Sequence, residues 1–329
     1  MHEALHYEKT TDGVICRLCP HFCRLQGGKT GLCGVRREEG GKLYTMNYGL
    51  CGAAAVDPIE KKPLYHFYPG RKIFSVGTAG CNLDCGFCQN WQLVRADGRD
   101  FLSLTPAELV AEIMSRSKDE RFGIAYTYAE PGMWFEFVLE TAALAKQKGL
   151  KNAMVTNGYL NPGPLKELLP LIDAFNIDVK AFTEDFYAEH CAGKLKPVLR
   201  YVEQAAASAH VELTYLVVTG LNDNAEEMKR FSSWVAEINP LIPVHLSRYF
   251  PQHRFNRPPT PIAVMERLRE TALQKLAYVY LGNVTVSGAS DTVCPGCGEV
   301  LVRRYAYRVD VRLRDGKCPT CKRPSDFKN

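Results

Sequence analysis

Three cysteines near residue 85 are the residues of this chain best suited to do chemistry. Cys81, Cys85 and Cys88 stand at the spacing C-x3-C-x2-C, with Phe87 just before the last of them. Each iron of a four-iron cluster needs a terminal ligand, and ordinary clusters of this kind take four cysteines. Three thiolates leave one iron open, so the spacing predicts a cluster that binds a substrate or cofactor directly.

A zinc or structural site is the alternative, because Cys-x2-Cys alone is a common zinc-binding pattern. No fourth cysteine lies near enough in sequence to complete such a site. The motif, with Phe87 in its aromatic place, resembles that of the radical S-adenosylmethionine (SAM) enzymes. The resemblance implies that SAM chelates the open iron of a [4Fe-4S] cluster, and that its reduction releases a 5′-deoxyadenosyl radical.

The composition is that of a soluble, cytoplasmic protein. The chain has 329 residues, 13 cysteines and a net charge of +5. Its first nine residues lack the apolar core of a signal peptide, and no run approaches the roughly 20 apolar residues that span a membrane. We therefore expect reduced thiols that bind metal rather than disulfides. So small a net charge does not indicate nucleic acid.

Short apolar runs alternate with helical patterns between residues 72 and 281, which predicts β–α units and a mainly parallel sheet. One helix should begin after Thr105, where a capping box precedes Pro106, and a second should end at Gly149. The expected strands are 72–76, 124–128, 152–156, 175–179, 211–218, 243–247 and 278–281. They are too few for a closed barrel, so we expect a partial, open (β/α)6-type radical SAM barrel over residues 71–290.

Polar residues fall at or just past the carboxyl ends of these strands, the end that forms the active site of parallel barrels. The surrounding segments resemble the glycyl-radical activating enzymes, including pyruvate formate-lyase activase. The resemblance implies that Glu130 accepts hydrogen bonds from SAM. The residues expected to bind SAM are Phe87, Glu130, Asn157, Asp178, Lys180 and His245. Val155 replaces the aspartate that the family carries before Thr-Asn-Gly, so one contact is missing.

Both ends of the chain carry cysteines at metal-binding spacings. Residues 291–329 contain two Cys-x2-Cys pairs, which is typical of a zinc ribbon. These ligands are Cys294, Cys297, Cys318 and Cys321. Residues 1–70 contain a tetrad, Cys16, Cys19, Cys23 and Cys33, whose spacing fits neither a ferredoxin nor a standard finger. It could bind zinc or a second iron–sulfur cluster, and we favour structural zinc.

The aromatic segment 57–70 is expected to be an ordered linker that packs over the barrel mouth. Together with the segments 31–36 and 88–91, it resembles the radical SAM member of the AmmeMemoRadiSam set. That resemblance implies Memo-like and AMMECR1-like partner proteins. The reaction also requires an electron donor of the flavodoxin or ferredoxin type.

We therefore expect a radical SAM enzyme that abstracts hydrogen from an unidentified substrate, with a peptide or protein suggested by analogy to the activases. An RNA-modifying radical SAM enzyme is the first alternative, and the basic residues of the C-terminal tail favour it. Its arginines are Arg303, Arg304, Arg308, Arg312 and Arg314. A non-catalytic scaffold that docks partners through its metal modules is the second. An open trio of cysteines has little structural purpose, which argues against the scaffold.

Overall fold

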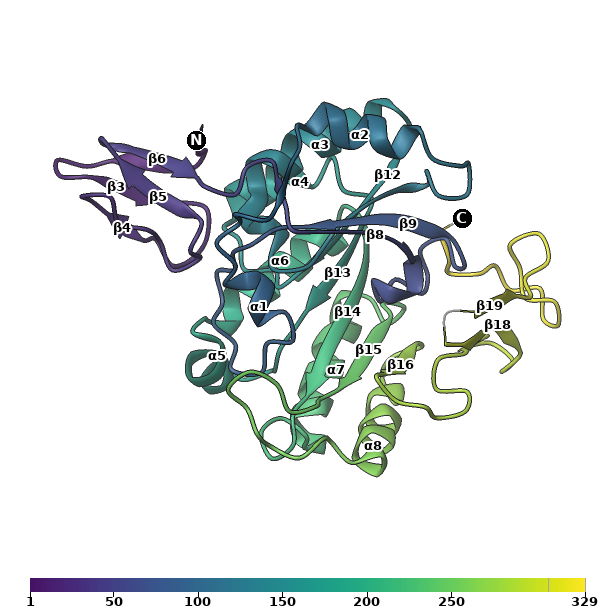
Figure 1. The fold of residues 1–329 in the computed structure, drawn as a ribbon. Helices are drawn as coiled ribbons and strands as arrows, with labels where there is room; N and C mark the ends of the chain where they lie inside the picture. The colour runs from purple at the N-terminus through teal and green to yellow at the C-terminus, as the bar shows by residue number, and fades with distance from the viewer. Residues whose placement is uncertain (307, 329) are drawn as a thin grey trace.

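The computed structural model describes residues 1–306 and 308–328. Its centre is an eight-stranded sheet with the strand order β16-β15-β14-β13-β12-β11-β9-β8. Seven of these strands are parallel, and β8 (Ala53–Pro58) pairs antiparallel with β9 at one edge. The edge strands β8 and β16 do not pair with each other, so the barrel stays open (Figure 1).

The parallel strands confirm the expected partial barrel. They are β9 (Lys72–Gly77), β11 (Gly123–Tyr126), β12 (Lys151–Thr156), β13 (Ala174–Asp178), β14 (His210–Val217), β15 (Val244–Arg248) and β16 (Val279–Gly282). Each lies within two residues of its predicted position. β11 is buried along its whole length, as expected for a parallel strand covered on both faces. The antiparallel β8 was not predicted.

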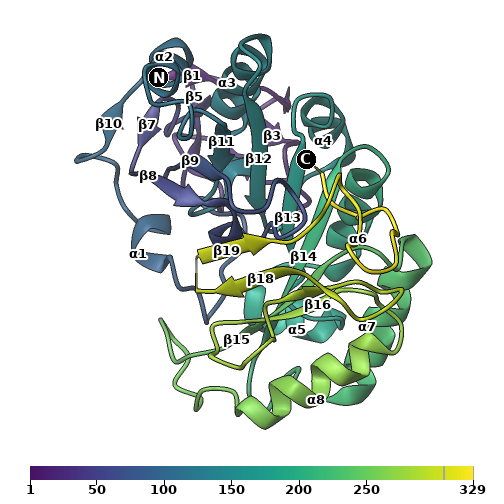
Figure 2. The same ribbon diagram turned by 90° about the vertical axis from the view of Figure 1, so that its right-hand side faces the viewer.

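Helices pack around the outside of the sheet (Figures 1 and 2). They are α1 (Trp91–Val94), α2 (Pro106–Met114), α3 (Phe135–Gln147), α4 (Pro162–Leu168), α5 (Glu184–Cys191), α6 (Leu195–Ala206), α7 (Ala225–Ile238) and α8 (Ile262–Leu273), with single 3-10 turns at η1 (Ile59–Lys61) and η2 (Pro131–Trp134). The predicted capping box is confirmed, since Glu108 N donates to Thr105 Oγ1 over 3.2 Å and Thr105 N donates to Glu108 Oε2 over 2.8 Å. None of the described helices combines the length and apolar character that a membrane crossing requires.

The two ends of the chain form small β-sheet modules. The first contains β1 (His2–Glu3), β2 (Tyr7–Lys9), β3 (Val14–Cys16), β4 (Arg24–Leu25), β5 (Arg36–Glu39) and β6 (Lys42–Thr45), in the sheets β1-β6-β5 and β2-β3-β4. The short β7 (Leu50–Cys51) then pairs with β10 (Leu102–Ser103). The last module is the sheet β17-β18-β19, made of β17 (Thr292–Val293), β18 (Val300–Tyr305) and β19 (Arg308–Val311). Figure 1 shows the two modules on opposite sides of the barrel.

A buried ion pair fastens the N-terminal module to the barrel. Arg36 Nη2 donates to both carboxylate oxygens of Glu136 in α3, over 2.6 and 2.7 Å. Both side chains are 1% exposed. The same two residues bind the backbone of Leu5, which donates to Glu136 Oε1 and accepts from Arg36 Nη1. A pair this deeply buried is stable only while both partners are present.

Replacing one partner of this pair should therefore be costly. We expect Glu136→Ala to lower the free energy of unfolding by about 3–5 kcal/mol, because it leaves the Arg36 charge buried without its counter-ion. Urea denaturation followed by circular dichroism measures the change. The matched control is Glu3→Ala, which breaks the exposed pair of Glu3 with Lys42 and should leave the midpoint unchanged. Equal effects of the two substitutions would contradict the anchoring role of Arg36.

Candidate active site and metal centres

A cavity of about 220 Å³ lies at the carboxyl ends of the parallel strands and collects most of the expected site residues. The loop after β9 contributes Cys81, Cys85, Phe87 and Cys88 to its lining. The following strands contribute Glu130, Thr156, Asn157, Asp178, Lys180, Thr214 and Ser247. Segments that lie up to 166 residues apart in sequence thus face one space, as the parallel topology requires.

The loop that carries the three cysteines is held by backbone hydrogen bonds from two directions. Asp84 N and Gly86 N donate to the carbonyl oxygens of Cys191 and His190 at the end of α5, over 2.9 and 3.1 Å. On the other side, Cys81 N donates to the carbonyl oxygen of Cys33 over 3.2 Å. The loop is therefore fixed both to the barrel and to the N-terminal module.

The three thiols fit an iron–sulfur cluster better than a single ion. Four thiolates around zinc lie about 3.8 Å apart, because Zn–S bonds are about 2.3 Å long and tetrahedral. Cys81, Cys85 and Cys88 do not form a group with all ligand atoms within 4.8 Å of one another. The cavity lining contains no fourth cysteine, so a four-iron cluster bound here would keep one iron open.

Burial makes these thiols dependent on a bound cation. Burial raises the pKa of Cys81 and Cys88. A hydrogen bond with the neighbouring Cys191 thiol, together with burial, raises the pKa of Cys85. The thiolate forms that ligate metal would therefore need the metal itself for stabilisation. Cys191 comes next to Cys85 from a distant helix, and its sequence context gave no signal of this.

Glu130 is buried where β11 and β12 end. Its Oε1 accepts hydrogen bonds from Gly132 N over 2.8 Å and from Thr156 Oγ1 over 2.7 Å, and its Oε2 accepts from Asn157 N over 2.8 Å. Burial nevertheless raises the pKa of Glu130 to about 7. The carboxyl group is thus positioned rigidly and sits at the boundary between its neutral and charged forms at physiological pH. Thr156, which the sequence analysis did not single out, is one of its supports.

Asp178 and Lys180 form an ion pair at the end of β13. Lys180 Nζ and Asp178 Oδ2 lie 2.6 Å apart. Burial alone would lower the pKa of Lys180, but the Asp178 carboxylate, with a contribution from Cys85, raises it above its ordinary value. The cavity therefore contains one firmly protonated ammonium beside a carboxylate, a pair that can bind the two charged groups of a free amino acid.

Asn157 connects the strand ends to the cysteine loop. Its Nδ2 donates to Asn82 Oδ1 over 2.9 Å and lies 3.6 Å from Cys81 Sγ. Asn82 in turn donates to the carbonyl oxygen of Tyr159 over 2.6 Å. The motif order Cys-Asn-Leu-Asp-Cys carried no indication of this role for Asn82, because its partners lie about 75 residues further along the chain.

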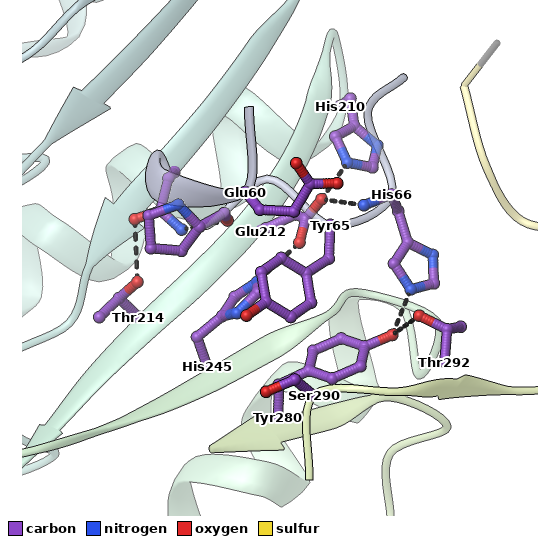
Figure 3. Close-up of polar contacts among 12 residues, drawn as sticks. Glu60, Tyr65, His66, His210, Glu212, Thr214, His245, Tyr280, Ser290 and Thr292 are labelled. Atoms are coloured by element: carbon purple, nitrogen blue, oxygen red, sulfur yellow. Dashed lines mark hydrogen bonds and ion pairs between the residues drawn. The ribbon is translucent and has the colours of Figure 1, made fainter. Parts of the chain in front are cut away.

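His245 does not line this cavity, so its expected place beside the cofactor is corrected. The sequence placed it near the carboxyl end of a strand, but it is the second residue of β15, close to the amino end. There His245 Nε2 bonds to Glu212 Oε2 over 2.7 Å. Figure 3 shows Glu212 between His210 and His245, with the backbone nitrogen of His66 beside it. Burial alone would raise the pKa of Glu212, but the two histidines hold it below its usual range.

The network around Glu212 continues into the C-terminal module (Figure 3). His66 Nε2 and Tyr280 Oη lie 2.6 Å apart, and Tyr280 Oη lies 2.8 Å from Thr292 Oγ1. Burial lowers the pKa of His66 to about 3, so this imidazole is neutral. The linker 57–70 therefore packs at the amino ends of β14, β15 and β16. The expectation that it covers the barrel mouth is wrong. Its backbone groups bind at the opposite end of the barrel, where His66 N donates to Glu212 Oε1 and Tyr68 N donates to Lys328 O.

The four C-terminal cysteines form a compact metal-binding group. Their sulfur atoms all lie within 4.8 Å of one another, with 3.5 Å between Cys294 and Cys321 and 3.6 Å between Cys297 and Cys318. These separations fit a single tetrahedral ion such as zinc. Only a small cluster, Leu301 and Val302 with Val309, Leu313 and Phe327, packs beside the thiols. A core of this size needs a metal to fold.

The comparison with known proteins identifies the barrel. The profile of the Radical SAM superfamily matches residues 75–234. The uncharacterized protein MJ0808 of Methanocaldococcus jannaschii is 39% identical over 329 residues, covering 98% of this chain and 97% of its own. Residues 75–234 therefore form a radical SAM domain. The protein is an enzyme of the kind that binds an iron–sulfur cluster and SAM.

Two further relatives of this radical SAM enzyme are informative. The pyruvate formate-lyase-activating enzyme of Clostridium pasteurianum is 27% identical over 180 residues, which cover 52% of this chain and 72% of the relative. The crystal structure of Streptococcus suis SuiB bound to S-adenosylmethionine superposes with a TM-score of 0.51 at 12% identity, over 70% of this chain and 54% of SuiB. The second similarity shows that the two proteins share a fold.

Removing one C-terminal ligand should release the metal of this radical SAM enzyme's tail. We expect Cys321→Ala to lose one metal ion per chain and to become sensitive to proteolysis between residues 308 and 322, because the remaining core is too small. Elemental analysis and limited trypsin digestion measure both effects. Cys51→Ala is the control, since Cys51 is buried outside all three cysteine groups. Unchanged metal content in Cys321→Ala would contradict the assignment.

Proposed function

We propose that this radical SAM enzyme cleaves SAM reductively and uses the 5′-deoxyadenosyl radical to abstract hydrogen from a substrate. The observation that carries the proposal is the meeting of three cysteines, Glu130 and the Asp178–Lys180 pair on one cavity. A [4Fe-4S] cluster bound by Cys81, Cys85 and Cys88 would supply the electron and the open iron. The protein residues would then fix the orientation of SAM around that iron.

The charges of the cavity match the methionine end of SAM. Lys180, kept protonated by Asp178, is suited to the carboxylate, and its three N–H groups leave donors for it. Glu130 is suited to the amino group, because its Oε2 accepts only one of the hydrogen bonds described above and keeps a lone pair for a further donor. Phe87 packs against Phe186 and Phe255 and shields the loop from water. Together these residues would hold SAM in one pose and exclude bulk solvent.

The substrate class that we propose is a peptide or protein. The similarity to a pyruvate formate-lyase-activating enzyme supports it, as does the open barrel, which leaves one side accessible to a bulky molecule. The resemblance to the AmmeMemoRadiSam set further suggests Memo-like and AMMECR1-like partners and an electron donor of the flavodoxin or ferredoxin type. An assay with those proteins would be the route to the substrate.

The structure weakens the RNA alternative. Arg304 is 7% exposed and its guanidinium lies over the Tyr65 ring, 4.2 Å from the centroid. Arg303 and Arg312 contact Asp291 and Asp310. Arg304 is therefore not available to phosphates, and the charges of Arg303 and Arg312 are partly compensated by acids. The C-terminal module uses the Arg304 charge to dock onto the barrel, so this charge is not available to an RNA-binding face.

The decisive assay is release of 5′-deoxyadenosine from SAM by anaerobically purified enzyme with a strong reductant. We expect release by the native protein and none by Cys85→Ala, because the trio cannot hold its cluster with two ligands. Cys51→Ala should behave as the native protein does. Liquid chromatography with mass spectrometry quantifies the product. Equal release by the native enzyme and Cys85→Ala would sink the proposal, and no release despite a full cluster and bound SAM would favour the scaffold.

The affinity for SAM should depend on pH through Glu130. Since burial raises the pKa of Glu130 to about 7, the carboxyl group is protonated and neutral below that pH. It then loses its ionic interaction with the cationic amino group of SAM. The Kd for SAM should rise by up to about tenfold per pH unit below pH 7 and level off above it. Calorimetric titration between about pH 6 and pH 8 measures it. In Glu130→Gln this pH-dependent limb should be absent, and its persistence there would assign it to another group.

A further inference from the structure

The N-terminal tetrad has the features of a second cluster site. Its four cysteines come from β3, from the turn between β3 and β4, and from the turn before β5. They are Cys16, Cys19, Cys23 and Cys33, and all four line one small enclosed cavity with Arg36 and Met133. Their convergence from separate turns shows that the module is folded around this space, which is also lined by Leu18, Leu25 and His21. His21 Nε2 lies 2.6 Å from the Asn82 carbonyl oxygen.

The spacing of these thiols argues against a single ion. Among the described residues, the C-terminal cysteines form a group with all sulfur atoms within 4.8 Å, close to the roughly 3.8 Å that tetrahedral zinc imposes. No three of the N-terminal thiols form such a group. Cys81, Cys85 and Cys88 likewise form no such group among the described residues. A polynuclear cluster spreads its thiolates further, because each binds a different iron.

Arg36 provides an independent observation. Its side chain is 1% exposed and its two terminal nitrogens are used by Leu5 O and Glu136. Its Nε is buried without a hydrogen-bond partner, and the residue lines the tetrad cavity. A buried N–H group left unpaired costs stability unless a ligand accepts its hydrogen bond. The sulfur atoms of an iron–sulfur cluster are such acceptors, and hydrogen bonds to them tune its potential.

We propose that Cys16, Cys19, Cys23 and Cys33 bind a second four-iron cluster, with Arg36 Nε–H donating to one of its sulfur atoms. Four protein thiolates leave this cluster without an open iron, so it does not bind SAM. The Cys33 carbonyl oxygen accepts from Cys81 N over 3.2 Å, so a ligand of one cluster contacts a ligand of the other. This assignment replaces the structural zinc that the sequence favoured.

Metal counting on the intact enzyme tests the proposal without using activity. Protein purified anaerobically from iron-supplemented cells should contain roughly eight iron ions, as two four-iron clusters, and one zinc ion. In Cys294→Ala/Cys321→Ala, which leaves the N-terminal thiols untouched, all zinc should be lost and the iron retained. About four iron and two zinc in the native protein, with one zinc left in this variant, would overturn the proposal.

Two cysteine variants locate the iron. Cys81→Ala/Cys85→Ala/Cys88→Ala should keep half of the iron and show the Mössbauer spectrum of a [4Fe-4S] cluster, because the N-terminal site is intact. Cys16→Ala/Cys23→Ala should lose the other half, with zinc unchanged. If the second variant does not fold, the first decides alone, since the [4Fe-4S] spectrum cannot come from the C-terminal thiols, which lie within 4.8 Å of one another as around a single ion. Complete loss of iron in the first variant would refute the second cluster.

The outcome is separate from that of the proposed function. An enzyme that fails to cleave SAM could still contain two clusters, and an active enzyme could contain one cluster and two zinc ions. Metal content therefore distinguishes the failure of this inference from the failure of the reaction proposed above.

Discussion

The parallel arrangement of seven strands is the constraint on which the rest of the molecule depends. It brings the carboxyl ends of β9, β11, β12 and β13 to one edge, where the loop of three cysteines, Glu130, Asn157 and the Asp178–Lys180 pair meet. Residues that are neighbours in sequence could not form this site alone, because its members follow different strands. A low-dielectric cavity then strengthens every charge placed in it, which explains the perturbed pKa values of Glu130 and Lys180.

Two buried arginines attach the terminal modules to this barrel. Arg36 pairs with Glu136 on one side, and Arg304 contacts Thr292, the Tyr65 carbonyl and the Glu60 carboxylate on the other. Arginine suits both positions, because its planar fork of five donors can satisfy several acceptors at once without water. In the N-terminal module this directional contact acts together with apolar burial, since Ala4, Val35 and Leu43 belong to the same hydrophobic cluster as the barrel.

Much of this could be predicted from sequence, and the failures have identifiable causes. The strands and the cysteine trio depend on local patterns. The strand bounds were therefore predicted to within two residues, and the spacing of the trio is read directly from the sequence. Glu130, Asp178 and Lys180 could be placed at one cavity because strand ends are local features too. His245 was misplaced, because its depth along β15 and its partner Glu212 are set by register with a neighbouring strand. The linker was misplaced for the same reason, since its contacts with Glu212 and Tyr280 lie more than 140 residues away.

The pairing of the linker with the end of the chain has a consequence for biosynthesis. Lys328 N donates to His66 O, and Tyr68 N donates to Lys328 O, so two segments about 260 residues apart close the base of the barrel together. At roughly 5–20 residues per second, a ribosome needs on the order of 10–50 s to make the intervening chain. During that interval His66 lacks part of its cover. The base of the barrel therefore stays incomplete until Lys328 has been made, 46 residues after the last barrel strand, β16, ends at Gly282.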